Sequence, residues 1–265
     1  MAITLKPTSK TSMKRKLTDS EFAAIEKRIV PVLDLTDPLK MVVYSRNKVG
    51  KTRFACSSEL KTLLIDCRER GTASVRKRGN VWVFRVTRWD DIDSLYWYLR
   101  SGKHDFEVTG IDTITMLAKI CMKWVLKDDL ERDMTKDPLL ADKRSWGKMG
   151  ELISDFILRF RDLPIHTLYL AQERVTATED EDGGVTKEIH PDLSPGPRTT
   201  LLSSVGVVGR LYVKEVEVDG KTKRERRMLL GAHPVFASGN RYDELRYVER
   251  NPTLQGFLDR INSGE

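Results

Sequence analysis

The sequence predicts an α/β fold, with a parallel sheet flanked by helices and a β-rich hairpin extension toward the C-terminus. Between residues 40 and 172, short apolar runs alternate with segments whose apolar residues recur at helical spacing. Beyond residue 172 the alternation stops, and Asp182-Gly183-Gly184 and Asp219-Gly220 are turn signals between β-rich segments. We therefore expect strands joined by crossover helices, followed by antiparallel hairpins.

Residues 1–37 are expected to form a basic, partly disordered N-terminal segment. Its first 20 residues are rich in Lys, Ser and Thr, include Lys14, Arg15 and Lys16, and hold few large apolar groups. A solvated tail and a nucleic-acid-binding arm are both compatible with this composition. Residues 38–265 are expected to form one domain.

The elements of this domain follow from apolar periodicity. Four-residue to six-residue apolar runs predict strands, and apolar residues spaced as Ile92, Leu95, Tyr96 and Leu99 predict helices. Strands that alternate with helices favour a parallel sheet covered on both faces. The expected order is strand 41–44, helix from Thr52, strands 62–66 and 81–86, helix 90–100, strand ending at Ile111, helices 113–130 and 146–162, strand 166–171, β-rich loops and hairpins over 172–250, and helix 252–262.

The composition narrows the class of protein. Hydrophobic content of 40% and charged content of 32% are typical of a folded globular chain, and the net charge of +7 favours anionic partners. No stretch approaches the about 18 apolar residues of a membrane span, so we expect a cytoplasmic protein without a membrane partner. The cysteines and histidines have neither C-x-x-C nor H-E-x-x-H spacing, so neither disulfides nor a zinc site is expected.

The most specific motif lies between the first strand and the first helix. Its residues fit G-x-x-x-x-G-K-[ST] at every position but the first, and they are Ser45, Arg46, Asn47, Lys48, Val49, Gly50, Lys51 and Thr52. In such a loop, backbone N–H groups cradle phosphates, the lysine bridges the β and γ phosphates, and the hydroxyl ligates Mg²⁺. The sequence thus predicts a site for ATP and Mg²⁺. Ser45 can begin the loop only if its φ is negative, because it lacks glycine's freedom.

Polar residues that follow later strands would complete the site. Asp112 is expected to hold Mg²⁺ together with Thr52, although it could equally cap the next helix. Asp66, at the end of the second strand, or Glu69, three residues later, is expected to orient attacking water or to bind the Mg²⁺ of the nucleotide. Glu69 is the favoured residue, and the alternative for both is a surface loop acid. Gln172 is expected to contact the γ-phosphate, and the alternative is a solvated amide.

These motifs together resemble RecA-fold ATPases. More narrowly, residues 38–262 resemble the short, core-only RecA-like P-loop proteins of bacteriophages, which are described as single-strand annealing or recombination ATPases with an AAA-type ATP-binding domain. The pieces that carry the resemblance are VVYSRNKVGKTRFA (42–55), LLIDCRERG (63–71), VTRWDDIDSLYWYL (86–99), GIDTITML (110–117), LYLAQER (168–174) and SGNRYDEL (238–245).

The resemblance implies roles for individual residues. Glu69 would be the catalytic glutamate, Gln172 the sensor of the γ-phosphate, and Arg241 a cation that reaches the nucleotide of a neighbouring subunit. It also implies a homo-oligomer that binds single-stranded DNA, works with a single-strand-binding protein and resides in the host cytoplasm if phage-encoded. Arg68 stands where that family has its glutamate, and Gly239 where a lysine often precedes the arginine. With Ser45, these departures put hydrolysis in doubt more than binding.

Two segments are expected to contact DNA. The stretch from Pro191 to Gly206, with Arg198, Thr199 and Thr200, is the expected flexible DNA loop, although an ordinary surface connection fits as well. The hairpin 211–230 is the second segment, and a solvated charged edge is its alternative. Its basic residues are Lys221, Lys223, Arg224, Arg226 and Arg227.

Three functions remain open from the sequence. The first is an ATP-dependent, oligomeric protein that binds single-stranded DNA in recombination or annealing. The second is a nucleotide-binding interaction module with little hydrolysis, favoured by Ser45, Arg68 and Gly239. The third is a P-loop kinase for a small metabolite, which the β-rich C-terminal part disfavours because such kinases normally carry an Arg-rich lid within the α/β half.

Overall fold

The structure is a computed structural model that describes residues 18–31, 37–137, 139–179, 185–218 and 220–264. It divides into two compact units, Met1–Asp37 and Pro38–Glu265. In the first unit, helix α1 (Asp19–Glu26) begins at Thr18, whose hydroxyl accepts from the Glu21 amide while the Glu21 carboxylate accepts from the Thr18 amide. The basic cluster from Lys14 to Lys16 lies outside the described residues.

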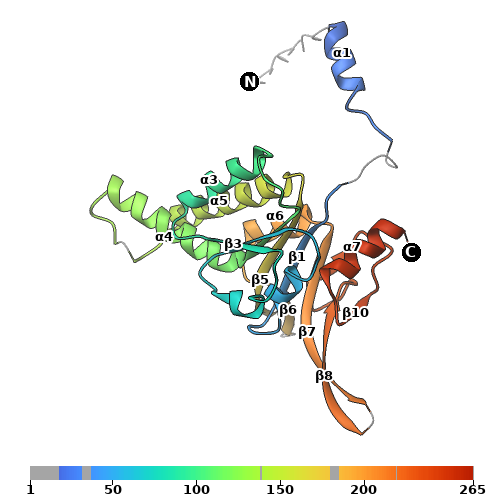
Figure 1. Cartoon of the computed structure of the whole chain (residues 1–265). Coiled ribbons are helices and arrows are strands. Elements are labelled where there is room, and N and C mark those ends of the chain that lie inside the picture. The colour runs from blue at the N-terminus through green and yellow to red at the C-terminus, as the bar shows by residue number, and fades with distance from the viewer. Residues whose placement is uncertain (1–17, 32–36, 138, 180–184, 219, 265) are drawn as a thin grey trace, which may run out of the picture. The chain divides into compact units, whose positions relative to one another are not determined.

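The second unit is a mixed α/β structure built on a ten-stranded sheet (Figure 1). Its strands run in the order β10-β8-β7-β1-β5-β4-β2-β3, with β6 paired to β5 and β9 paired to β7. The strands are β1 (Lys40–Ser45), β2 (Thr62–Asp66), β3 (Val81–Arg85), β4 (Val108–Asp112), β5 (His166–Glu179), β6 (Val185–Pro191), β7 (Val207–Val218), β8 (Lys221–Leu229), β9 (Gly239–Asn240) and β10 (Val248–Arg250).

The centre of the sheet is parallel. Strands β7, β1, β5, β4, β2 and β3 pair in parallel, whereas the pairs β7–β8, β8–β10, β7–β9 and β5–β6 are antiparallel. All residues of β2 and β4 are buried, so neither strand alternates between buried and exposed residues, as expected for central strands of a parallel sheet covered on both faces. The fold is that of a P-loop NTPase core with C-terminal hairpins, as the sequence predicts.

Helices cover both faces of the sheet, and alternate side chains of each strand separate the two cores. Val42 and Tyr44 of β1 pack into one core with α3, α4, α5 and α6, whereas Met41 and Val43 pack into the other with α2 and α7. The helices are α2 (Lys51–Ala55), α3 (Asp90–Arg100), α4 (Ile114–Arg132), α5 (Lys143–Arg161), α6 (Pro195–Ser204) and α7 (Leu254–Ser263), and a 3-10 turn, η2, spans Gly71–Ser74.

Two features differ from the expected elements. The strand expected over 166–171 continues to Glu179 and pairs with β6 in a hairpin whose turn, including Asp182 to Gly184, lies outside the described residues. The expected flexible loop from Pro191 to Gly206 is wrong, because residues 195–204 form α6, which begins with Pro195 at its first position.

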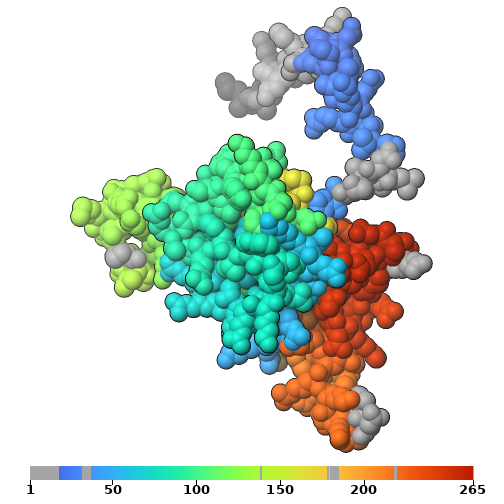
Figure 2. All heavy atoms as spheres, in the orientation of Figure 1, coloured from blue at the N-terminus to red at the C-terminus, as the bar shows by residue number. Residues whose placement is uncertain are grey.

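The antiparallel hairpin of β7 and β8 is the main feature of the β-rich part. Figure 2 shows it, in orange, extending away from the rest of the second unit. Gly220 in its turn has a φ of 68°, which glycine adopts without strain. Within the described ranges, no helix combines the length and the apolar character that a membrane crossing requires.

Candidate nucleotide-binding site

The predicted site residues meet at the carboxyl edge of the parallel strands. Ser45, the last residue of β1, is paired in register with Gln172 of β5, and Asp66 of β2 is paired with Asp112 of β4. Ligands of open parallel sheets bind outside this edge, because loops and helix N-termini from successive strands gather there. The topology alone therefore brings together segments that are more than 100 residues apart in sequence.

The phosphate loop connects β1 to α2. Ser45 is fully buried and is absent from the described non-glycine residues with positive φ, so it occupies the loop's first position without backbone strain. The left-handed positions are instead Lys48, with φ 63°, and Gly50, with φ 119°. Since L-residues with side chains rarely adopt the Gly50 conformation, this is the glycine that the loop requires.

Lys51 folds back onto its own loop. Its ammonium group donates to the carbonyl oxygen of Ser45, the hydroxyl of Ser45 and the carbonyl oxygen of Arg46, each at 3.2 Å. Burial lowers the pKa of Lys51, although the nearby carboxylates of Asp112 and Glu69 act in the opposite direction. The serine that replaces the first glycine thus supplies two of the three acceptors for the lysine.

Thr52 and Asp112 form the second part of the site. The Thr52 hydroxyl donates to Oδ2 of Asp112 at 2.6 Å, and burial raises the pKa of Asp112 to about 6. Gly71 lies against this pair, since a Cβ at that position would come within 2.9 Å of Thr52 Oγ1 and 3.1 Å of Asp112 Oδ2. A hydroxyl beside a carboxylate supplies the hard oxygen ligands that Mg²⁺ prefers, so these residues fit the ion.

Glu69, the predicted catalytic carboxylate, comes one residue later than in the Asp-x-Glu pattern and lies among the other predicted site residues. Its Oε1 accepts from the amide of Gln172 at 2.9 Å and from the hydroxyl of Thr113 at 2.9 Å. The predicted carboxylate and the predicted sensor are therefore in direct contact. Thr113, which also caps α4 by accepting from Met116 N, is a site residue that sequence reasoning did not assign.

Glu173 was also missed by the sequence analysis. Its carboxylate is 3% exposed and pairs with Arg210 of β7 at 2.9 Å and with Arg46 of the phosphate loop at 3.4 Å. It ties the phosphate loop and β7 to β5, directly after Gln172. Its position in sequence was the only available signal, because a glutamate at a strand end is ordinarily solvated.

Arg226 lies on the phosphate loop rather than on a free hairpin surface. Its Nε donates to the carbonyl oxygen of Val49 at 2.9 Å, and a Cβ at Gly50 would come within 2.9 Å of the same nitrogen. The backbone of Arg226 is fixed in turn, because its carbonyl oxygen accepts from Asn251 N at 2.7 Å. The sequence grouped Arg226 with the expected DNA-binding residues, and the structure instead places it against the phosphate loop.

This contact predicts a specific effect of mutation. Replacing Arg226 with alanine should weaken ATP binding about fivefold, because a hydrogen bond that holds the loop contributes about 1 kcal/mol. Arg224→Ala is the matched control, since Arg224 shares the strand face but pairs with the exposed Glu215 at 3.1 Å. Titration with a fluorescent ATP analogue measures both variants. Equal affinities in the two would contradict the role of Arg226.

The two strand faces separate the basic residues of the hairpin. Because neighbouring strand residues point to opposite faces, Lys221 and Lys223 share one face of β8, and Arg224 and Arg226 share the other. Lys214 of β7 lies on the lysine face, since it is paired with Glu225. None of the ion pairs that the structure describes engages any of the three lysines, whereas Arg227 pairs with Glu225 at 2.6 Å.

Arg241, the predicted cation for a neighbouring subunit, lies away from the phosphate loop. Arg241 follows β9, which pairs with Val207 and Val208 at the amino end of β7, and its guanidinium donates to Ser203 O at 3.1 Å. It is therefore at the opposite sheet edge from the ATP loop of its own chain.

Arg198 and Thr199 lie in α6. The guanidinium of Arg198 contacts Nε2 of the buried His190 at 2.5 Å, and the Thr199 hydroxyl donates to Pro195 O. Both side chains are therefore engaged within the fold, and neither belongs to a flexible loop.

Comparisons with known proteins agree with this geometry. The family described as AAA domain matches residues 37–242, which include the phosphate loop, Asp112 and Gln172. No curated protein matches the sequence. Since the match covers more than half of the 265 residues, the chain belongs to the AAA domain family, whose P-loop NTPase domain binds nucleotide, typically with Mg²⁺.

Proposed function

We propose that this protein is an ATP-dependent, RecA-like protein of the bacteriophage recombination and annealing type, which binds single-stranded DNA as a homo-oligomer. The observation that carries the proposal is the convergence of Lys51, the Thr52–Asp112 pair and the Glu69–Gln172 contact at one sheet edge. These groups supply a phosphate-binding cation, oxygen ligands for Mg²⁺, a carboxylate for water and an amide for the γ-phosphate. ATP binding needs the cation and the Mg²⁺ ligands, and hydrolysis needs the carboxylate and the amide as well.

The position of Arg241 supports action as an oligomer. It lies at the amino end of β7, whereas the phosphate loop lies at the carboxyl end of the neighbouring β1. Within one chain this cation cannot reach the bound phosphates. A second copy that places Arg241 against the first copy's ATP would supply the missing positive charge in the transition state.

The charge distribution supports a DNA partner. The chain carries a net charge of +7, and Lys214, Lys221 and Lys223 form a lysine face on the β7–β8 hairpin without an ion-pair partner among the described residues. Such a face favours contacts with phosphates, and the affinity should then fall with salt by about 0.7 log units per log unit of salt for each phosphate contact.

Lys51→Ala is expected to weaken ATP binding by about 10- to 100-fold while the fold persists. Lys51 is 7% exposed, and loss of its ammonium group removes a charge-assisted phosphate contact of about 1.5–3 kcal/mol. Arg53→Ala, an exposed position two residues along α2, is the control and should bind normally. Calorimetric titration with ATP and Mg²⁺ gives the affinities, and an unchanged affinity for Lys51→Ala would reject this site.

One assay separates the proposed function from its two rivals. ATP hydrolysis is measured with and without single-stranded DNA at several salt concentrations. Stimulation by DNA that declines with salt is the expected result. DNA binding that requires ATP but proceeds without ATP turnover would indicate an interaction module. This rival is favoured by the position of Arg241, which lies far from the phosphate loop of the same chain. ATP consumption only in the presence of a small phosphate acceptor would indicate a kinase.

A further inference from the structure

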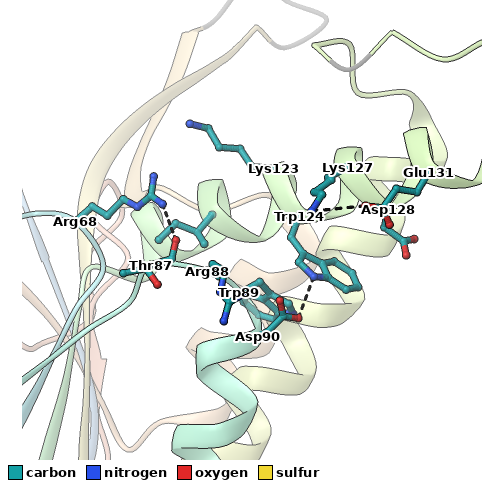
Figure 3. A pocket seen from close by; sticks show the side chains of 11 residues that line it. Arg68, Thr87, Arg88, Trp89, Asp90, Lys123, Trp124, Lys127, Asp128 and Glu131 are labelled. Atoms are coloured by element: carbon teal, nitrogen blue, oxygen red, sulfur yellow. Dashed lines mark hydrogen bonds and ion pairs between the residues drawn. The ribbon is translucent and has the colours of Figure 1, made fainter. Parts of the chain in front are cut away.

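A basic groove adjoins the nucleotide site beyond the ends of β2 and β3. It consists of two neighbouring cavities, of about 410 and about 900 Å³, which share Arg68 and Thr87 in their linings. The first lies between the start of α3 and the outer side of α4, and the second lies beside Asp66, Arg70 and Arg85. We call this feature the Arg68 groove, and Figure 3 shows its first cavity.

The Arg68 groove has an excess of positive charge. Arg68, Arg70, Arg85 and Lys123 line it, and none of them takes part in the ion pairs that the structure describes. The acids of the first cavity are already engaged with other groups: Asp128 with Lys148 and Arg132, Glu131 with Lys127, and Asp90 with the indole of Trp124. Arg70, Arg85 and Lys123 are thus available to an anionic ligand, whereas the guanidinium of Arg68 donates to Thr87 O at 2.6 Å.

Two aromatic side chains also line the first cavity. Trp124 of α4 and Trp89 at the start of α3 both line the first cavity, and Figure 3 shows them on neighbouring helices with Lys123 and Arg88 beside them. Nε1 of Trp124 donates to Asp90 at 3.1 Å, which fixes the orientation of the ring. An indole held in place in a cavity that cations also line is suited to a nucleobase, because bases stack on aromatic rings while their phosphates pair with Arg and Lys.

The groove is physically connected to the hydrolytic carboxylate. Arg68 and Arg70 line the cavities, while Glu69 between them contacts Gln172 and Thr113 on the nucleotide side. Both arginines adopt a left-handed backbone, with φ of 70° and 53°, which costs non-glycine residues roughly 1–2 kcal/mol each. Strain of this kind is found at functional sites, and a ligand that pulls on either arginine would move Glu69.

We propose that the Arg68 groove binds single-stranded nucleic acid, with a base against Trp124 and phosphates on Arg85 and Lys123. The proposal rests on the function inferred above and adds to it a binding surface that continues into the ATPase site. Occupation of the groove acts on Glu69 through Arg68 and Arg70, so strand binding and ATP turnover are coupled through three consecutive residues.

The first test is charge reversal in the full chain. Binding of a fluorescein-labelled dT20 oligonucleotide is followed by anisotropy in wild type and in Arg85→Glu/Lys123→Glu. The double variant should bind at least 30-fold more weakly, and its log-log salt slope should be smaller by about 1.4 for two lost phosphate contacts. Arg100→Glu/Lys103→Glu makes the same charge change at exposed positions outside the groove and should alter affinity less than threefold. Thermal unfolding verifies that all variants are folded.

The second test reads the indole directly. Unlabelled dT20 should quench the intrinsic tryptophan fluorescence of the wild type, and Trp124→Phe should remove most of that quenching. Trp146→Phe is the matched control, because Trp146 lies on α5, is 53% exposed and lines neither cavity; this variant should retain the quenching.

The outcomes separate the groove from the function on which it rests. If wild type binds no dT20 with or without a non-hydrolysable ATP analogue, the DNA-binding part of the proposed function is wrong, and the groove proposal is wrong with it. If wild type binds but both groove variants match their controls, the groove proposal alone is overturned. Loss of binding in Lys221→Glu/Lys223→Glu would then identify the hairpin as the DNA surface. Displacement of dT20 by dTMP at equal affinity would also overturn the groove proposal, by identifying a mononucleotide site.

Discussion

Asp112→Asn is expected to stabilise the ligand-free protein at pH 7.5 by about 3 kcal/mol and to abolish Mg²⁺-dependent ATP binding. Burial raises the pKa of Asp112 from 3.8 to about 6, so the folded chain holds an unfavourable buried carboxylate at neutral pH. Asparagine has nearly the same shape, keeps an oxygen that accepts from Thr52, and carries no charge. Asp112, the predicted Mg²⁺ ligand, thus destabilises the folded protein when no Mg²⁺ is bound.

The difference in unfolding free energy between the wild type and Asp112→Asn grows as the pH rises. Below pH 3.8 the carboxyl group is protonated in both the folded and the unfolded chain, and it affects folding least there. As the pH rises from 3.8 to 6, the unfolded chain loses the proton first, so the wild type loses stability relative to Asp112→Asn. Above pH 6 the difference is constant at its largest value.

Urea unfolding at pH 4 and pH 7.5 measures the effect. The two proteins should differ by about 3 kcal/mol at pH 7.5 and by a small fraction of that at pH 4. Asp155→Asn, an exposed position on α5, is the control and should change stability by less than about 0.5 kcal/mol at either pH. A destabilised Asp112→Asn at neutral pH would mean that the carboxylate, rather than its neutral form, is favoured by the fold.

The parallel core could be predicted from the sequence because its signals are local. Strand β2 contains the apolar run Leu63 to Ile65, and α3 begins and ends where its periodicity does, at Asp90 and Arg100. The extension of β5 to Glu179 could not be predicted, since its last residues are exposed and polar and gain their structure from pairing with β6. Helix α6 was missed because Pro, Gly and Ser are read as loop residues, whereas here Pro195 starts a helix.

The site was predictable in outline and not in its contacts. The motif and the strand ends locate Lys51, Thr52, Asp112 and Gln172, because a parallel sheet brings its carboxyl ends to one edge. The contact of Arg226 with Val49 joins residues 177 positions apart through an antiparallel hairpin, and no local pattern encodes that distance. The division of the basic residues of β8 between two faces could likewise not be predicted, because it depends on residues 221–229 forming one uninterrupted strand.

The position of Glu69 departs from the Asp-x-Glu pattern of the RecA-like proteins that the sequence resembles. An Asp-x-Glu spacing would place the carboxylate at residue 68, where Arg68 instead donates to Thr87 O and lines the groove. The left-handed backbone of Arg68 and Arg70 turns the chain so that Glu69 reaches Gln172 and Thr113. The one-residue shift therefore still leaves a carboxylate beside the amide of Gln172.

Glu69→Gln is accordingly expected to lower ATP turnover at least about 100-fold and to change ATP affinity less than about twofold. A general base of this kind contributes roughly 10²- to 10⁴-fold to the rate, and glutamine cannot accept the proton of the attacking water. Its side-chain oxygen can still accept from Gln172 and Thr113, so the site should keep its shape. Glu151→Gln, at an exposed position on α5, is the control and should turn over at the wild-type rate.

Single-turnover hydrolysis and calorimetric ATP binding separate the two effects in Glu69→Gln. Loss of turnover with retained binding would assign the chemistry to Glu69 despite its shifted position. Wild-type turnover in this variant would remove Glu69 from the mechanism, and the water would then have to be oriented by another acid at the same edge, of which Asp66 is the nearest in sequence. Asp66 accepts from Arg70 N at 3.1 Å and is 3% exposed, so it holds the very loop that carries Glu69. Asp66→Asn would lower turnover whether Asp66 is the base itself or only holds the loop that carries Glu69. Only Glu69→Gln therefore tells these two roles apart.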